Sequence, residues 1–292
     1  MFFEKYNKKT DGAIRFFDLH SKKTKIFCII IFAVCLGIMV VSLFPAIWVF
    51  LASFKDIKEF RRNATILPES FNIQAYIKTW NDLKFLKYYV NSFISVAGCV
   101  VSAVVFNGLL AYGLGVLKPK GHKIVFALVM WSLLIPPTTS IVALFVNINK
   151  IGLNKSFVPL WLSLGANAFY VVLFKEFFEG IPKEYIEAAK LDGASSLKIF
   201  RSVILPLSQS IVMVVVIFAI NAAWSDFLLP YLVLGGSAKE TVMVRLYQFN
   251  TSNATDVEVL RGVAFSIIPP IILFALFQKQ ITLGAAAGGI KG

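Results

Sequence analysis

Six stretches that contain no Asp, Glu, Lys or Arg divide this 292-residue sequence. They are 17 to 30 residues long, and a helix needs about 20 apolar residues to cross a bilayer. We therefore expect an all-α, polytopic membrane protein with six transmembrane helices. The predicted spans are residues 26–50, 90–117, 124–148, 156–176, 208–232 and 259–279.

The composition favours a membrane protein over a soluble one. Hydrophobic residues make up 58% of the chain and charged residues 15%, against roughly 45–50% and about 25% in soluble proteins. A net charge of +13 would suggest nucleic acid for a soluble chain, but the sequence has no nucleic-acid-binding motif. Basic residues also gather in the cytoplasmic loops of membrane proteins, so we expect no nucleic-acid partner.

The cysteines and histidines do not predict a metal site or a disulfide framework. Cys28, Cys35 and Cys99 lie inside apolar stretches, and His20 is far from His122. An odd number of cysteines without paired spacing argues against disulfides and zinc. The chain is thus expected to bind no cofactor of its own.

The basic residues predict how the chain is oriented. Six spans place both termini on one side, and 17 of the 29 Lys and Arg residues fall on that side. Because basic residues mark the cytoplasm, we expect residues 1–25 and 281–292 to be cytoplasmic. The first span exceeds the 7–15-residue apolar core of a signal peptide, which favours an uncleaved helix. Residues 55–87 are then external, as amphipathic helices on the membrane, as a docking surface for an extracellular partner, or as both.

Two proline pairs fall inside predicted spans. Pro136 and Pro137 lie in the third span, and Pro269 and Pro270 lie in the sixth. Proline removes a backbone donor and kinks a helix, so both spans are expected to bend.

A charged loop between the fourth and fifth spans, residues 177–207, predicts two short helices around a turn. Pro182 suits the first helical position. Asp192 followed by glycine signals a turn, and Ser195 or Ser196 is expected to cap the second helix.

One face of the first helix in this loop offers little side-chain bulk. Tyr185, Ala188 and Ala189 are spaced i, i+3 and i+4 and therefore share a face. Another protein can approach the two alanines closely, and Glu187 beside them can make a charge-assisted contact. Gly193 allows a sharp turn after the helix.

This loop resembles the cytoplasmic E-A-A motif of binding-protein-dependent ABC importer permeases. The family pattern is E-A-A, three residues, G, nine residues, then I-x-L-P. Residues 187–189 read E-A-A, Gly193 follows after three residues, and Val203 stands at the isoleucine position.

Further segments resemble the carbohydrate-uptake branch, in particular its second permease of the maltose or multiple-sugar type. These segments are Asn91-Ser92, residues 111–113, 151–154 and 221–227, and the glycine-rich C-terminus. The resemblance covers nearly the whole chain after residue 26. It implies a type I ABC importer permease bundle in the plasma membrane of a prokaryote, with a cytoplasmic coupling helix.

The resemblance also implies partners. The sequence has no G-x-x-x-x-G-K-[ST] phosphate loop, so ATP and Mg are expected on separate ATPase subunits and this chain is not expected to be an enzyme. The implied partners are a sister permease, two cytoplasmic ATPase subunits, an extracellular solute-binding protein, the lipid bilayer and a carbohydrate. The implied ATPase-coupling residues are Glu187, Ala188, Ala189, Asp192 and Gly193.

Candidate residues for the solute path are Asn221, Trp224 and Asp226. An ionisable residue within a span marks a pathway by default, and Trp224 offers a ring for stacking on a sugar. Asp226 also lies near the outer end of its span, where it can simply face water. Two alternatives stay open: a permease of the same branch for a non-sugar solute such as glycerol phosphate, and an ion-coupled secondary transporter.

Overall fold

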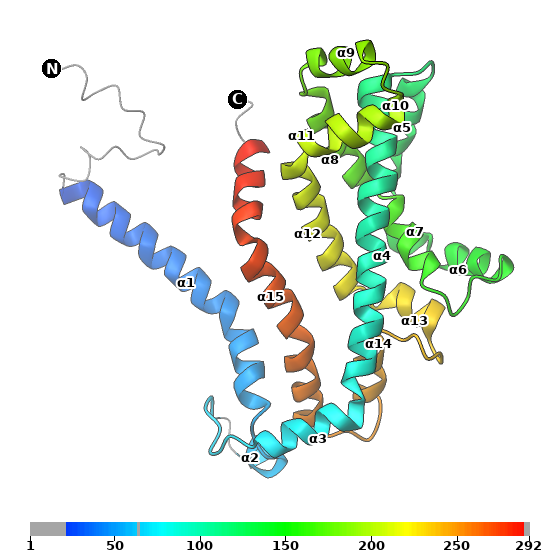
Figure 1. Ribbon diagram of the computed structural model, residues 1–292. Helices are drawn as coiled ribbons and strands as arrows, with labels where there is room; N and C mark the ends of the chain where they lie inside the picture. The colour runs from blue at the N-terminus through cyan, green and yellow to red at the C-terminus, as the bar shows by residue number, and fades with distance from the viewer. Residues whose placement is uncertain (1–21, 63–64, 289–292) are drawn as a thin grey trace. The chain divides into compact units, whose positions relative to one another are not determined.

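The computed structural model describes residues 22–62 and 65–288, and every regular element in these ranges is helical (Figure 1). The all-α class is therefore confirmed for this part of the chain. Two compact units are present, the first ending at Phe71 and the second beginning at Asn72. The predicted permease domain, residues 26–280, includes parts of both. Of the predicted N-terminal segment, residues 1–21 lie outside the described residues.

The first unit contains α1 (Lys22–Ala52) and α2 (Ile57–Arg62). A buried polar cluster follows α1. The Lys55 Nζ lies 3.9 Å from Glu59 Oε1 and donates a 2.8 Å hydrogen bond to Thr65 Oγ1. Because buried charges are tolerated only when they are paired and hydrogen-bonded, this cluster holds α2 and the segment after it in a defined conformation.

The second unit is built around α4, which packs against α7, α8 and α12, while α12 also packs against α15. Its α-helices are α3 (Ile73–Leu83), α4 (Phe85–Tyr112), α5 (His122–Ser132), α6 (Ile141–Lys150), α7 (Val158–Gly165), α8 (Ala168–Glu179), α9 (Lys183–Leu191), α10 (Ser196–Ile199), α11 (Leu205–Leu207), α12 (Gln209–Ser225), α13 (Leu228–Leu234), α14 (Val242–Asn250) and α15 (Asp256–Gly288). Two π-helices, η3 (Gly113–Leu117) and η5 (Phe200–Ile204), and a 3₁₀ turn, η4 (Pro137–Thr139), connect them.

Three helical segments of the described chain are long and apolar enough to cross a membrane. They are Thr24–Ala52, Phe85–Leu117 and Asp256–Gln278. Two bent pairs qualify when each is counted as one span: α7 with α8, bent by 45°, and the α10–α11 segment with α12, bent by 85°. The described residues thus hold three to five candidate spans, and the number six stays a prediction.

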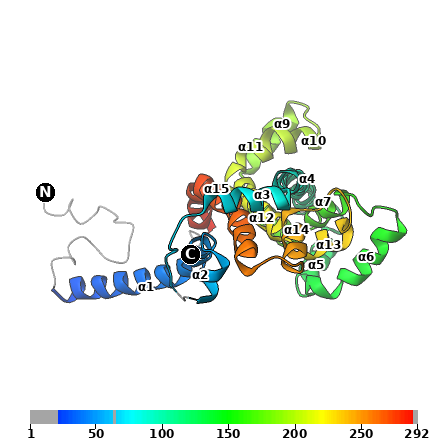
Figure 2. The same cartoon turned by 90° about the horizontal axis from the view of Figure 1, so that it is seen from below.

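The predicted third span, residues 124–148, is two helices and not one kinked helix. α5 ends at Ser132, and α6 begins at Ile141 after the 3₁₀ turn. Proline disfavours helical geometry in the residue before it as well as removing its own donor, so the pair Pro136-Pro137 terminates the helix. As a result α6 projects from the side of the second unit (Figures 1 and 2). Pro269 and Pro270, in contrast, lie inside the continuous helix α15.

Other predicted boundaries also shift. The helix in the predicted fifth span, residues 208–232, ends at Ser225 because Asp226 has an extended backbone and α13 forms a separate helix. The helices that contain the predicted second and sixth spans begin at Phe85 and Asp256, before the predicted starts of those spans. α15 continues to Gly288, so the predicted C-terminal tail is helical as far as it is described.

The beginning of α4 holds the loop between α13 and α14. The Asn91 Nδ2 donates 2.9 Å hydrogen bonds to the carbonyls of Ala238 and Glu240, and Ser92 Oγ accepts one from Val242 N at 2.9 Å. These bonds satisfy backbone carbonyl and N–H groups that have no hydrogen-bond partner within a helix. The pair Asn91-Ser92 therefore has a clear structural role here.

Aromatic side chains pack α3 against the beginning of α4 and against α15. The ring of Trp80 stacks on Phe85 with centroids 5.3 Å apart, and meets Phe265 edge-on at 5.0 Å. Tyr76 contacts the same Phe265 at 5.3 Å. The predicted external segment is thus partly helical, as expected, and the prediction that it docks an extracellular partner is not tested by these contacts.

We expect Phe174→Ala to destabilise the second unit strongly. Phe174 is fully buried in α8 and stacks on Phe178 at 5.4 Å, and truncating a buried Phe typically costs about 3–5 kcal/mol through the cavity it leaves. Thermal unfolding of the purified protein in detergent should show a clearly lower midpoint. Phe169→Ala on the same helix, where 46% of the side chain is exposed, is the control. An equal fall in the unfolding midpoint for both variants would contradict the placement of Phe174 in the hydrophobic core.

Candidate functional site

The helix of the predicted coupling loop is α9, and its two ends are fixed by local backbone interactions. Pro182 is its N-cap, one position before the place predicted for it, and Glu184 lies in the first turn, where the helix dipole favours an acid. At the other end Gly193 has φ +75°, and the N–H of Ala194 donates to the carbonyl of Ala189 at 2.9 Å. This left-handed glycine ends the helix in a Schellman motif.

The next helix starts as the sequence predicted. Ser195 is the N-cap of α10, and its side chain accepts a hydrogen bond from Lys198 N at 3.4 Å. The loop therefore consists of two short helices around a glycine turn, as expected. α11 includes Leu205 and Pro206 and ends at Leu207.

α9 is attached to the bundle by its inner face. Ile186 is 8% exposed and belongs to the same hydrophobic cluster as Phe178, Ile199 and Phe200. Ala189 packs against this cluster and is half-buried. A short helix has little stability of its own, so this anchor is what gives α9 a defined orientation.

The outer face of α9 carries the predicted coupling residues. Glu187 and Ala188 are exposed on the helix, and Asp192 and Gly193 are exposed in the turn after it. The structure thus brings the five predicted residues together on one short helix and its turn, with Ala189 facing inward.

Two exposed apolar side chains beside these residues were not predicted. Leu191 is 89% exposed and Leu197 is 66% exposed. Leu191 lies four residues after Glu187 and three after Ala188, and this helical spacing alone places it on their face.

α9, α10 and α11 lie at one end of the second unit (Figure 1). The C-terminal end of α15 points toward the same end, whereas α3 and α14 lie at the opposite one. The three predicted solute-path residues lie near the C-terminal end of α12, which is the end away from α9.

Trp224 packs inside the chain. It is 4% exposed, its Nε1 donates to the carbonyl of Ser266 at 3.1 Å, and its ring contacts Tyr89 and Phe93 at 5.7 and 5.6 Å. A sugar ring stacked on this indole would have to displace these contacts. The geometry therefore favours a structural role for Trp224 in joining α12 to α15.

Asn221 is exposed and lies on a groove between α12 and α15 of about 270 Å³. One edge of Trp224 reaches the same groove, whose other walls are aliphatic and aromatic side chains of the two helices. Asn221 is the polar side chain in an otherwise apolar lining.

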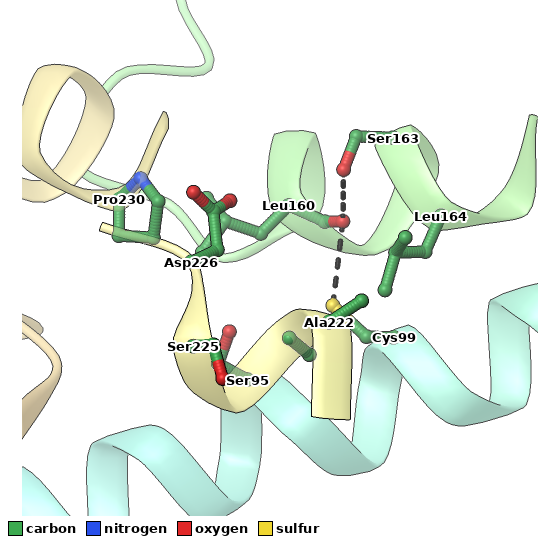
Figure 3. Close-up of a pocket in the computed structure, with 10 residues that line it drawn as sticks. Ser95, Cys99, Leu160, Ser163, Leu164, Ala222, Ser225, Asp226 and Pro230 are labelled. Carbon is green, nitrogen blue, oxygen red and sulfur yellow. Dashed lines mark hydrogen bonds between the residues drawn. The ribbon is translucent and has the colours of Figure 1, made fainter. Parts of the chain in front are cut away.

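Asp226 lines a different cavity, of about 360 Å³, between α4, α7, α12 and α13 (Figure 3). Ser95, Ser163 and Ser225 add hydroxyl groups to its wall, and Cys99 adds a thiol. The backbone N–H groups at the beginning of α13 also interact with the Asp226 carboxylate. The three predicted solute-path residues thus divide between two pockets, and Asp226 belongs to the more polar one.

Within residues 22–62 and 65–288, no group of three or more His, Cys, Asp or Glu side chains is placed to hold a metal ion. The three cysteines are free thiols.

The helical bundle and the exposed helix at its end define the class of protein. Residues 26–282 match the family described as the binding-protein-dependent transport system inner membrane component. The chain belongs to this family of membrane-embedded transport permeases.

Individual relatives include transport proteins from Bacillus subtilis (strain 168). The chain is 31% identical to the probable ABC transporter permease protein YurM, over 85% of this chain and 84% of that protein. It is 26% identical to the arabinooligosaccharides transport system permease protein AraQ, over 94% and 99%, and 28% identical to the melibiose/raffinose/stachyose import permease protein MelC, over 78% and 84%.

A solved structure shares the fold. It is a chain of a bacterial ABC transporter involved in the import of the acidic polysaccharide alginate, and the TM-score is 0.76 at 24% sequence identity. The match covers 89% of this chain and 98% of that one, which confirms the ABC importer permease fold.

We expect Trp224→Phe to reduce stability and to leave the maximal uptake rate per assembled importer unchanged. The variant loses the hydrogen bond to Ser266 O, which is worth about 0.5–1.5 kcal/mol, and keeps the aromatic packing. Thermal unfolding and uptake kinetics of the assembled importer measure the two effects. A lower maximal uptake rate with unchanged stability would instead assign the indole to the solute path.

Proposed function

We propose that this chain is a membrane-spanning subunit of an ATP-driven importer for a sugar or oligosaccharide, and that α9 is its contact with a cytoplasmic ATPase subunit. The observation that carries the second part is the outer face of α9. It exposes Glu187, Ala188 and Leu191 while Ile186 holds the helix to the core. The names of AraQ and MelC support a carbohydrate as the solute.

In this proposal each residue of the α9 face has a physical task. Ala188 lets the ATPase surface approach the helix backbone, and Leu191 fills an apolar hollow there. Glu187 and Asp192 make charge-assisted hydrogen bonds to that surface. ATP and Mg are held by the ATPase subunits, because this sequence contains no phosphate loop.

The proposed topology has six crossings, with α5 and α6 together forming the third. Both termini are then cytoplasmic in the plasma membrane of a prokaryote. The position of the C-terminal end of α15 at the α9 end of the second unit supports this (Figure 1), as does the excess of basic residues on that side. The remaining partners are a sister permease within the bilayer, a second ATPase subunit, and an extracellular solute-binding protein at the opposite end.

We expect Gly193→Asp to assemble normally but to uncouple solute uptake from ATP hydrolysis. A Cβ at Gly193 meets no atom within 4 Å, and Asp is one of the few residues that visit the left-handed conformation. The added carboxylate therefore disturbs the docked partner more than the chain itself. Uptake into proteoliposomes should fall at least tenfold, at an unchanged amount of assembled importer.

Gly152→Asp is the matched control for this variant. Gly152 has φ +73°, and a Cβ added there would likewise meet no atom within 4 Å, but it lies in the loop after α6, not beside α9. Its uptake should stay near that of the unmodified chain. Normal uptake by Gly193→Asp would refute the assignment of α9 as the coupling helix.

The cavity beside Asp226 is the better candidate for solute contact. Its carboxylate and the three serine hydroxyls suit the hydroxyl groups of a sugar, whereas Asn221 lies on a largely apolar groove. Asp226 is therefore proposed to accept hydrogen bonds from the solute during translocation, and Asn221 and Trp224 are not.

We expect Asp226→Asn to lower the maximal uptake rate about tenfold, which corresponds to about 1.4 kcal/mol. Asn keeps an oxygen for the N–H groups at the beginning of α13 and removes the charge. The half-saturating concentration should stay the same, because the external binding protein selects the solute. Uptake kinetics in proteoliposomes provide the test, and an unchanged maximal rate would leave Asp226 with its structural role only.

A further inference from the structure

α7 and α8 belong to different packed clusters. α7 contributes Leu160 to a cluster with residues of α6 and α13, whose buried members include Ile148 and Val233. α8 contributes Phe174 and Phe178 to the cluster that also holds Ile186 of α9. α8 and α9 therefore share one packed cluster, whereas the buried Leu160 of α7 lies in another, and the half-buried Leu164 at the end of α7 packs against both.

The boundary between these clusters is a break in the helix. α7 ends at Gly165, α8 begins at Ala168, and the axes differ by 45°. A break leaves carbonyls at the end of one helix and N–H groups at the start of the next without intrahelical partners. In a membrane these groups must be satisfied by the protein.

One buried side chain of α4 satisfies both sides of the break. Asn107 is 1% exposed. Its Nδ2 donates to the Leu164 carbonyl at 2.8 Å, and its Oδ1 accepts from Asn167 N at 2.9 Å. A second Nδ2 bond, to the Ala103 carbonyl of its own helix at 2.8 Å, fixes the orientation of the amide. Asn167 in turn caps α8 by accepting from Tyr170 N at 3.1 Å.

The break also lies directly against α4. A Cβ at Gly165 would be 2.9 Å from Phe106 Cδ2 and 3.4 Å from Ser102 Cβ. The absence of a side chain at Gly165 is what brings the break within hydrogen-bonding distance of Asn107.

We propose that residues 165–167 form a hinge at which the α8–α9 body turns relative to α7, and that Asn107 is the positioning residue that sets the hinge angle. The proposal deepens the proposed function, since it rests on α9 as the helix that the ATPase moves. Motion of α9 passes through Ile186 into the cluster that contains α8. It is absorbed at residues 165–167, where the helical hydrogen-bond ladder is already interrupted.

Spin-label distances in the assembled importer test the hinge directly. Labels at Leu162→Cys in α7 and Lys183→Cys in α9 occupy exposed positions on the two bodies. The background carries Cys28→Ser, Cys35→Ser and Cys99→Ser, and must retain uptake. We expect the distance between the labels to differ between the nucleotide-free and ATP-bound importer. The same distance in both states would overturn the hinge.

Asn107→Leu tests the role of the amide with a side chain of similar size. We expect the label distances to spread over a wider range in both states, and uptake per ATP hydrolysed to fall at least fivefold, while ATP hydrolysis stays within twofold. Ser102→Ala is the matched control, because it removes a hydroxyl next to the same break and none of the Asn107 hydrogen bonds. Distances and uptake per ATP like those of the unmodified chain would refute the role of Asn107.

These experiments distinguish a failure of the hinge proposal from a failure of the proposal that α9 contacts the ATPase. If Gly193→Asp transports normally while the label distance still depends on Asn107, the hinge stands and α9 is not the ATPase contact. If Asn107→Leu does not assemble, the distance change in the chain with the native Asn107 still decides whether the hinge exists.

Discussion

The backbone of this protein must satisfy its hydrogen bonds without help from water along most of its length, and its broken helices meet this requirement with specific side chains. Asn107 supplies an acceptor and donors to the break between α7 and α8. Asn91 and Ser92 do the same for the loop that precedes α14. Since an unsatisfied polar group in hydrocarbon costs several kcal/mol, these three residues of α4 stabilise two of the places where the chain leaves helical geometry.

α4 is consequently the element from which the second unit is organised. One end of it holds the loop before α14 and the aromatic cluster around Trp80, and Asn107 in its last third holds the break before α8. Toward its other end Tyr112 packs on Phe200, with ring centroids 5.4 Å apart, in the cluster that anchors α9. The proposed coupling helix is therefore connected to the α7–α8 break through apolar packing on α8.

The conformation of the predicted coupling loop could largely be predicted because its signals are local. Glu184, Gly193 and Ser195 determine helix ends through contacts within four or five residues, so spacing alone predicted both helices and the turn. The division into two units and the break before α8 were not predictable in this way. Nothing in the neighbourhood of Asn167 shows that an amide 60 residues earlier accepts its N–H.

For the predicted solute-path residues, closeness in the sequence likewise did not predict where their side chains lie. Asn221, Trp224 and Asp226 lie within six residues of one another, yet their side chains belong to a groove, an aromatic cluster and a separate polar cavity. Burial of Trp224 depends on Tyr89, Phe93 and Ser266, which come from other helices.

The sequence by itself determined that the chain is an all-helical membrane protein with a small, charged, turn-ended helix between its fourth and fifth apolar stretches. Apolar length, proline and glycine placement and capping residues act over a few positions and can be read along the chain. Only the tertiary structure decided that Pro136-Pro137 ends a helix while Pro269-Pro270 does not, and that Asn107 closes the break after Gly165. Those outcomes depend on which distant groups are close enough to satisfy the backbone at each interruption.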